Sequence, residues 1–175
     1  CENFIMPEMV SYTQTFENML SSVEQAGCQT AYGVAGDTFT LGDAQLKLLW
    51  PTEGFDTSDP NEISLVLQVT YGEYSFLLTG DAGETAEEGF LSQVQPVTVL
   101  KAGHHGSDTS STEAFLQKAQ PEYVVISVGA GNSYGHPSPA MLERLDENCQ
   151  VLRTDEKGSI VFTVKEGELH VSTAR

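Results

Sequence analysis

Three short motifs place residues that can bind a metal or a phosphate directly after apolar segments. In the first, the segment Ser75–Thr79 leads into Asp81, which is flanked by Gly80 and Gly83. A carboxylate at a strand end can bridge two cations or serve as a single metal ligand. The alternative is that Asp81 caps the helix predicted to follow it, which is the commoner role of an Asp in a turn. The metal interpretation therefore depends on the residues around Asp81.

The second motif is the pair His104–His105, which follows the apolar segment 97–101 in the sequence Gly-His-His-Gly-Ser. Adjacent side chains at a strand end point to opposite sides, so we expect one imidazole to bind a metal and the other to contact surrounding groups. Lys101 could supply a cation near bound phosphate, or it is a solvated surface lysine. Ser107 lies in the same loop and is a candidate substrate contact.

The third motif is the loop 131–137, which contains Asn132 and His136 and lies between a buried strand and a helix start. His136 is interpreted as a third imidazole ligand or a phosphate contact, with Asn132 beside it as a substrate contact. The alternative is a helix-entry loop with a capping imidazole. The glycine spacing resembles a dinucleotide fingerprint, but the last gap is one residue too long, so a nucleotide site is excluded.

Alternating apolar and polar residues and turn signals predict the elements that position these motifs. The strongest prediction is a hairpin of strands 62–70 and 74–79. Further strands are predicted at 4–6, 29–34, 38–41, 44–50, 97–101, 123–128, 151–153, 159–164 and 168–171. Helices are predicted at 16–26 with Thr15 as N-cap, 84–92, 112–119 and from Ser138 to about Glu147. The pattern indicates one domain over residues 1–175, a mixed α/β layer structure that ends in a β hairpin.

The charge of the chain is unevenly distributed. The 175 residues carry a formal net charge of −17 at pH 7. Residues 1–100 contain fifteen acidic residues and Lys47 as their one basic residue, whereas residues 101–175 contain ten acidic and seven basic residues. An acidic surface usually serves solubility, and it opposes sequence-independent binding to phosphate backbones. A polyanionic substrate would have to be attracted by metal ions or by the less acidic second part.

Cysteine use and hydropathy narrow the class of protein further. The three cysteines, Cys1, Cys28 and Cys149, form no Cys-x-x-Cys motif, so neither a disulfide framework nor a zinc knuckle is predicted. No apolar run approaches the roughly 18 residues of a membrane span, and no signal segment is present. Cys1 has the position of a lipid-anchored first residue. The apolar segment 4–7 follows it without a flexible spacer, so we do not expect lipidation.

Four ordered segments carry a resemblance to a known family. They are SLVLQVTYGEYSFLLTGDAGETAE, VLKAGHHGSDTSS, YVVISVGAGNSYGHPSPAMLERLDE and VLRTDEKGSI. Together they resemble the C-terminal half of the metallo-β-lactamase superfamily, and more specifically the hydrolase domain of ComEC-type DNA-uptake proteins. The segment FIMPEMVSYTQTFENML is also similar to the region after the metal-binding loop there, so the resemblance covers nearly the whole chain.

The resemblance implies a fold, a site and a cofactor. The expected fold is one half of an αββα sandwich. Asp81 falls on the metal-bridging aspartate of the family, His104 or His105 on its final histidine ligand, and His136 on its Tyr-Gly-His-Pro motif as a metal or phosphate contact. The implied catalytic residues are Asp81, His104 and His105. The implied cofactor is zinc or manganese, with two ions in the parent protein.

The chain departs from the family pattern upstream of Asp81. The family's His-x-His-x-Asp-His cluster precedes this region, and the sequence contains no histidine before His104. A catalytic zinc site usually needs three protein ligands and a water molecule. We therefore expect at most one weakly bound ion and little activity from the chain alone. A His-x-His-x-Asp-His cluster upstream in the parent protein would support the enzyme hypothesis, and the 175 residues do not decide whether it exists.

The leading hypothesis for the parent protein is a metal-dependent hydrolase of phosphodiester bonds, of nuclease or phosphodiesterase type. The alternative is a non-catalytic binding or interaction module on a degenerate hydrolase scaffold. The expected substrate contains phosphate; nucleic acid fits the resemblance, although the acidic charge disfavours it. Half a sandwich would expose an apolar sheet face, so we also expect either the missing N-terminal half or self-association to cover that face. The resemblance implies a bacterial protein and leaves its compartment open.

Overall fold

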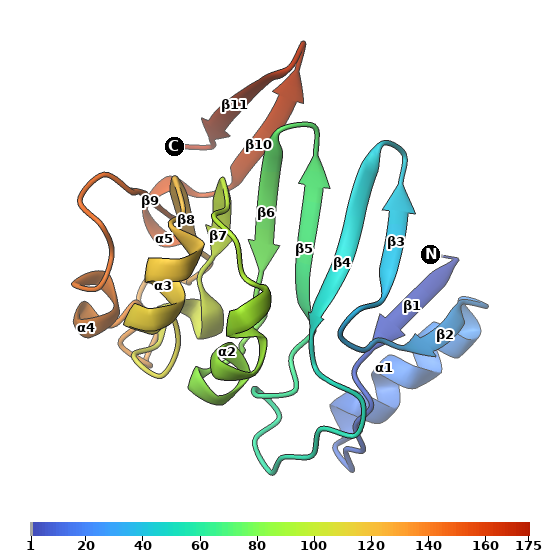
Figure 1. The fold of residues 1–175 in the computed structure, drawn as a ribbon. Coiled ribbons are helices and arrows are strands. Elements are labelled where there is room, and N and C mark those ends of the chain that lie inside the picture. The colour runs from blue at the N-terminus through green and yellow to red at the C-terminus, as the bar shows by residue number, and fades with distance from the viewer. Residues whose placement is uncertain (1) are drawn as a thin grey trace.

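A computed structural model describes residues 2–175, and Cys1, with the expectation attached to it, lies outside the described residues. The centre of the fold is a seven-stranded sheet in the order β3-β4-β5-β6-β7-β8-β9 (Figure 1). Its strands are β3 (Thr38–Leu41), β4 (Ala44–Trp50), β5 (Val66–Tyr71), β6 (Tyr74–Leu78), β7 (Val99–Lys101), β8 (Tyr123–Ile126) and β9 (Gln150–Arg153). The mixed α/β class predicted from the sequence is confirmed.

The sheet changes direction at β6. Strands β3 to β6 pair antiparallel, with tight turns between β3 and β4 and between β5 and β6 and a long loop, residues 51–65, between β4 and β5. Strands β6, β7, β8 and β9 pair parallel. Parallel neighbours need crossover connections, and here these contain the helices α2 (Glu84–Phe90) and α3 (Glu113–Ala119). As a result, the carboxyl ends of β6, β7 and β8 meet at one edge of the sheet, and each continues into one of the three motifs.

One face of the sheet is covered by helices. Figure 1 shows α2 and α3 in front of the parallel strands, with α4 (Pro139–Leu142) at the left of the view. Met141 of α4 belongs to the same core. Fully buried side chains from the strands and helices form the core here, and Phe90 meets Phe115 edge to face with ring centroids 5.6 Å apart. The strand residues of this core are Leu49, Trp50, Val66, Leu77, Leu100, Val124 and Ile126.

The opposite face is covered only in part by the described residues. The hairpin β10 (Ile160–Lys165) and β11 (Glu168–Thr173) packs Phe162 against Phe76 and Tyr123, with centroid distances of 6.0 and 5.5 Å. Beyond the hairpin, this face carries an alternating apolar set. Its members include Leu41, Leu46, Leu67, Val69 and Leu78, of which Leu41 and Leu78 are exposed.

The first part of the chain forms a small unit beside β4. The strands β1 (Asn3–Met6) and β2 (Gln29–Tyr32) pair parallel, and α1 (Gln14–Gln25) connects them. Helix α1 begins two residues earlier than predicted, because the Thr13 hydroxyl rather than that of Thr15 accepts the hydrogen bond from the Phe16 N–H. No residue of α1 is buried.

Most predicted elements are present, several with ends shifted by one or two residues, and three differences are larger. Strand β5 begins at Val66 instead of residue 62, because a turn forms there with Ser64 N donating to Asn61 O. Helix α4 ends at Leu142 instead of near 147, and the Asp146 side chain accepts from both nitrogens of Asn148 in a local turn. The short helix α5 (Thr154–Lys157) was not predicted. Within residues 2–175, no helix has the length and apolarity to cross a bilayer.

Candidate active site

Polar side chains from two adjacent motifs meet at the carboxyl ends of β6 and β7. Asp81 lies in the loop after β6, Lys101 is the last residue of β7, and His105 lies in the short 3₁₀ segment η2 (Gly103–Gly106). Asp81 Oδ1 is 3.5 Å from His105 Nε2 and 3.8 Å from Lys101 Nζ. The first two motifs of the sequence therefore form one cluster.

The loop that carries Asp81 is held by its backbone rather than by its carboxylate. The Asp81 N–H donates to Ser64 Oγ at 3.1 Å, and Lys101 Nζ donates to the carbonyl of Gly80. Helix α2 has Gly83 as its N-cap, with no side-chain capping bond. The interpretation of Asp81 as a helix cap is therefore wrong, and its carboxylate instead faces Lys101 and His105.

Lys101 is not a solvated surface lysine. Its side chain is 22% exposed and reaches over the loop to Gly80 and Asp81. Burial lowers the pKa of Lys101, and the neighbouring Asp81 partly offsets that effect. An ammonium group held in this way is a positive charge at a fixed point of the sheet edge, where it can contact an anion.

The two histidines point to different neighbours for a reason that the sequence did not reveal. Strand β7 ends before them, and both adopt a left-handed backbone, with φ of 44° at His104 and 57° at His105. The expectation that the alternation of side chains along a strand separates the two imidazoles is therefore wrong. Left-handed conformations at non-glycine residues cost about 1–3 kcal/mol each and occur often at functional sites. A Cβ at Gly103 would lie 2.6 Å from Ala82 O, so tight packing fixes this segment.

The hydrogen bond of His105 determines what its other ring nitrogen presents. Nδ1 lies 2.7 Å from the carbonyl oxygen of Ser127 and must donate to it, because a carbonyl only accepts. In the neutral ring, Nε2 then carries a lone pair that faces Asp81 Oδ1. An imidazole with Nδ1 bonded to a carbonyl is the usual arrangement of a metal-binding histidine. A cation between Nε2 and the carboxylate would satisfy both groups.

His104 contacts the third motif instead. Its ring centroid lies 5.8 Å from that of His136. Asn132 holds His136 in place: its Oδ1 accepts from the His136 N–H at 3.1 Å, and its Nδ2 donates to the His136 carbonyl at 2.7 Å. His136 Nδ1 is buried and has no hydrogen-bond partner within residues 2–175. Ser138, not His136, occupies the N-cap position of α4.

Ser107 and Asn132, which were predicted to contact the substrate, form hydrogen bonds within their own loops. The buried Ser107 hydroxyl lies 3.0 Å from Thr109 Oγ1, within its own turn. The Asn132 amide is engaged with the backbone of its own loop. Their contact with a substrate remains a prediction.

The donors present do not complete a metal site by themselves. In the part of the chain that the structure describes, no three His, Cys, Asp or Glu side chains are grouped so that they could hold one ion. The Asp81–His105 pair fits two positions of a coordination sphere, and a catalytic zinc usually takes three protein ligands. A complete metal centre therefore does not fit on these residues alone.

The sequence pattern did not predict the carboxylate that supports the segment after the histidine pair, residues 107–112. Glu87, on α2, is 1% exposed and accepts from the N–H groups of Ser111 and Thr112 at 2.6 and 2.8 Å. Burial raises its pKa above the ordinary value, and these hydrogen bonds oppose the shift. A signal was present, because Glu87 lies between Ala86 and Phe90 on the apolar side of the helix.

Arg144 supports the same loop from the other side. Its guanidinium donates to the carbonyls of Ser110 and Asp108 at 3.0 and 2.9 Å. Together with Glu87, it fixes the segment that follows the histidine pair.

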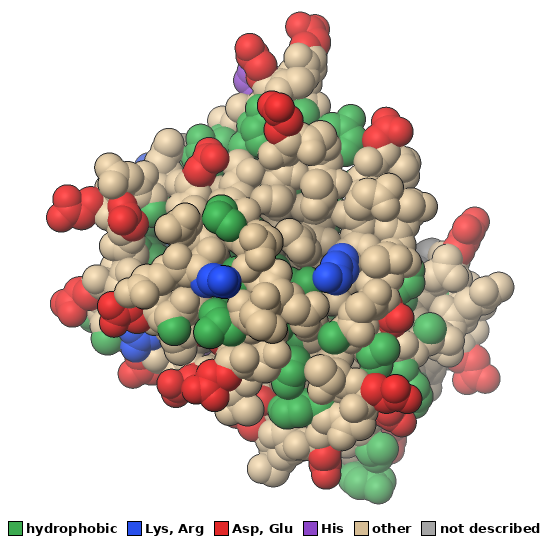
Figure 2. Space-filling model, in the orientation of Figure 1, with side chains coloured by type: hydrophobic (Ala, Val, Ile, Leu, Met, Phe, Trp, Pro, Cys, Tyr) green, Lys and Arg blue, Asp and Glu red, His purple; other side chains and the backbone are tan. Residues whose placement is uncertain are grey.

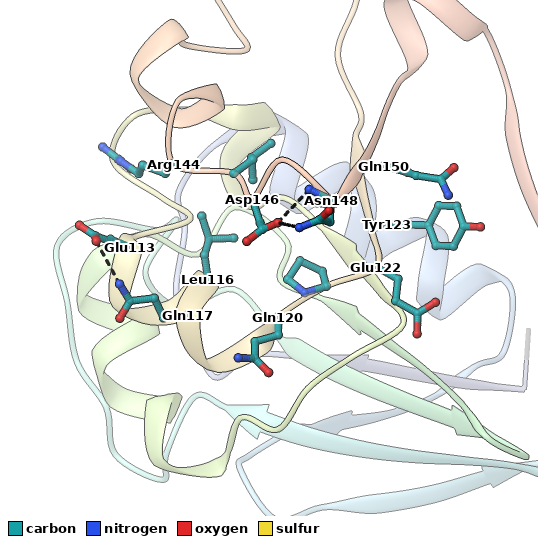
Figure 3. Close-up of a pocket in the computed structure, with 13 residues that line it drawn as sticks. Glu113, Leu116, Gln117, Gln120, Glu122, Tyr123, Arg144, Asp146, Asn148 and Gln150 are labelled. Atoms are coloured by element: carbon teal, nitrogen blue, oxygen red, sulfur yellow. Dashed lines mark hydrogen bonds between the residues drawn. The ribbon is translucent and has the colours of Figure 1, made fainter.

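A groove of about 690 Å³ lies away from this cluster (Figure 3). Its lining includes Tyr123 and Gln150, the first residues of β8 and β9, so it lies at the opposite edge of the sheet from Asp81. Its walls are about equally polar and apolar and include Glu113 with Gln117, and Asp146 with Asn148. The chemistry of the three motifs therefore marks the candidate site better than cavity volume does.

The surface around these features is acidic. Figure 2 shows acidic side chains spread over the visible face, with few basic ones among them. This agrees with the net charge of −17.

Comparisons with known proteins identify the family. The sequence model of the metallo-beta-lactamase superfamily matches residues 37–130. The chain is 36% identical over 152 residues to ComE operon protein 3 of Bacillus subtilis. The alignment covers 85% of this chain and 20% of that protein. It is 37% identical over 133 residues to competence protein ComA of Neisseria gonorrhoeae, with 74% and 19% covered.

A solved structure agrees at the level of the fold. The CmlA beta-hydroxylase E377D mutant aligns with a TM-score of 0.54 and 13% identity, covering 86% of this chain and 38% of that one. The chain spans about a fifth of the length of the two curated relatives. The matched region contains β3 to β8, Asp81 and both histidines of the pair. The chain belongs to the metallo-beta-lactamase superfamily.

Proposed function

We propose that the protein containing this chain is a metal-dependent hydrolase of phosphodiester bonds, of nuclease or phosphodiesterase type. The observation that carries the proposal is the geometry of Asp81 and His105, with Oδ1 and Nε2 3.5 Å apart. When the His105 ring is neutral, its Nε2 lone pair is directed at the carboxylate, because Nδ1 donates to the Ser127 carbonyl. Superfamily membership supports the hydrolase class.

Each residue of the cluster has a separate role in this proposal. Asp81 and His105 supply one pair of ligands for zinc or manganese, and the remaining ligands come from elsewhere in the protein. The metal would supply the activated water. Lys101 binds an oxygen of the substrate phosphate as a fixed positive charge. His104 and His136 line the adjoining space, where a buried imidazole nitrogen has no partner in residues 2–175.

The test measures metal content and hydrolysis together. The natural gene product that carries these 175 residues is assayed by mass spectrometry for zinc and manganese, and for cleavage of bis(p-nitrophenyl) phosphate. We expect Asp81→Asn and His105→Ala each to lower kcat/KM by about 100-fold or more, because each removes a group that acts on the reacting centre. Metal content falls in the same variants.

Matched controls separate this effect from general damage. His170→Ala removes an exposed imidazole on β11, and Asp56→Asn an exposed carboxylate in the loop after β4. Both are expected to retain metal and activity. The hydrolase proposal fails if Asp81→Asn retains full metal content and full turnover. The isolated chain is expected to be nearly inactive, and rapid turnover by it would contradict the division of ligands proposed above.

A second candidate is a non-catalytic binding module. It is favoured by one observation, the lack of three grouped ligands among the described side chains. In that case the natural protein binds a phosphate-containing ligand through Lys101 and the histidines but cleaves no diester. Binding without turnover in the same assay would select this alternative.

A further inference from the structure

One exposed aromatic side chain beside the candidate site is unaccounted for by the proposed chemistry. Tyr134 is 81% exposed, although its ring is large and apolar. It lies nearly parallel to the His136 ring, with an interplanar angle of 13° and centroids 6.0 Å apart. One face of the tyrosine ring is thus directed at the site and most of the ring remains available to solvent.

The loop beneath Tyr134 is held in one shape. Asn132 Oδ1 accepts from the N–H groups of both Tyr134 and His136, at 3.2 and 3.1 Å. Its Nδ2 donates to the carbonyls of Gly129 and His136 at 3.1 and 2.7 Å. A ring on a preorganised loop loses little conformational freedom when a ligand stacks on it. The arrangement suits a fixed platform.

The platform continues a row of rings that ends at the proposed catalytic cluster. His136 lies 5.8 Å from His104, and His104 lies 6.4 Å from His105, measured between ring centroids. His105 in turn faces Asp81 at 3.5 Å. A planar group on Tyr134 would therefore lie at the far end of this row of rings from the phosphate held by Lys101.

The acidic charge of this chain increases the share of nucleic-acid binding that must come from contacts other than ion pairs, such as stacking. Binding to nucleic acid usually depends on Lys and Arg, and this chain carries a net charge of −17. Stacking of a base on an aromatic ring does not require positive charge and is tolerant of sequence, because every base has a flat face. An acidic protein that takes a polyanionic strand needs contacts of this kind.

We infer that Tyr134 is the platform on which an unpaired nucleobase of a single nucleic-acid strand stacks, while a phosphate of the same strand binds at the candidate active site. The inference rests on the proposed function and names the substrate class for that site. Phosphodiesters without a planar ring, such as polyol phosphate polymers, would not use Tyr134.

The test compares two labelled strands by fluorescence anisotropy. One is a short oligothymidylate, and the other is an abasic strand of the same length with the same phosphates. Both are titrated with the natural protein at about 150 mM salt, where the Debye length is about 8 Å. We expect Tyr134→Ala to weaken binding of oligothymidylate by about 5- to 150-fold. Binding of the abasic strand should not change, and Tyr134→Phe should bind both strands like the wild type.

A matched control and a second readout keep the inference testable. Tyr12→Ala removes a tyrosine that is 93% exposed in another part of the molecule, and it should leave both affinities unchanged. The inference is overturned if Tyr134→Ala weakens both strands equally, or neither. Cleavage of bis(p-nitrophenyl) phosphate reports the proposed function separately. If the protein cleaves the diester but Tyr134→Ala does not weaken binding of oligothymidylate, the platform inference alone fails. If Tyr134→Ala weakens oligothymidylate binding selectively but the protein cleaves no diester, the hydrolase proposal alone fails.

Discussion

The two faces of the seven-stranded sheet are built from the same strands but have different surroundings. On the helix-covered face, Leu77, Leu100 and Val124 are at most 1% exposed. On the opposite face, Leu78 of the same strand as Leu77 is 39% exposed. On β4 and β5 the alternation is more apolar on the open side, which carries Leu46, Leu67 and Val69, than on the side of the helices, which carries Gln45, Lys47 and Gln68. Apolarity of the strands alone therefore does not predict which face is covered. What differs is the layer packed on each face.

This difference in packing shows that contacts on the helix-covered face stabilise the chain and that the opposite face is available to a partner. The covered face contains the core, with α2, α3 and α4 packed on it. Among the described residues, the open face has the β10–β11 hairpin over β6 and β8, and the segment at Gly33 packs on Leu48 of β4, which is 3% exposed. We propose that the rest of the protein, or a second copy of this chain, packs on the open face. An exposed apolar face of this kind is uncommon on a monomer.

The largest expected effect is a cavity on the covered face. Phe115→Ala removes a fully buried ring that packs edge to face on Phe90. It should lower the free energy of unfolding by about 3–5 kcal/mol, measured by urea denaturation. The matched change on the open face, Phe76→Ala, removes a half-buried ring and should cost about 1–2 kcal/mol. Equal costs would show that the two faces do not differ in packing.

A medium effect is expected at the buried carboxylate on the covered side. Glu87→Gln leaves one acceptor for the two N–H groups of Ser111 and Thr112, and should cost about 1–3 kcal/mol at pH 5. The pKa of Glu87 is raised by burial and by nearby Glu62, so folding favours its protonated form. Wild-type stability should therefore decline as the pH rises above the ordinary value of 4.5 through the raised pKa.

The Gln variant lacks this titration, so the difference from the wild type should narrow as the pH rises. Urea denaturation between pH 5 and 8 measures it. Glu88→Gln, at the exposed neighbouring position, serves as the control and should follow the wild type at every pH. A gap that is constant with pH would contradict the proposed ionisation of Glu87.

The smallest effect on stability is expected on the open face. Leu78→Asn should change the free energy of unfolding by less than about 1 kcal/mol, because the side chain is already partly in water. It should weaken self-association of the isolated chain, measured by sedimentation velocity over a range of concentrations. Leu20→Asn on α1 is the control, since Leu20 is 38% exposed and Leu78 is 39% exposed. A compact monomer at all concentrations would exclude the second copy as the partner.

Sequence analysis predicted the sheet elements well where local signals were strong. The bounds of β3 and β4 agree with the prediction, because Gly42 provides the positive φ of 56° that their tight turn needs. The terminal hairpin was also predicted from Glu166 and Gly167, which both adopt left-handed conformations. The predicted length of helix α4 was too great, because the Asp146 side chain accepts from the Asn148 N–H and forms a turn there instead. Helix propensity alone does not describe this competition between side chain and helix backbone.

The sequence by itself determined the order of the motifs and their positions after β6, β7 and β8, because apolar runs and turn residues specify strands locally. It therefore predicted that Asp81, the histidine pair and His136 would meet at one edge. Only the tertiary structure decided that His105 faces Asp81 and His104 faces His136. That choice depends on left-handed backbone angles, which the close packing of Gly103 against Ala82 imposes. It also decided that Glu87 is buried and that one apolar face stays open, since both depend on which layers pack against the sheet.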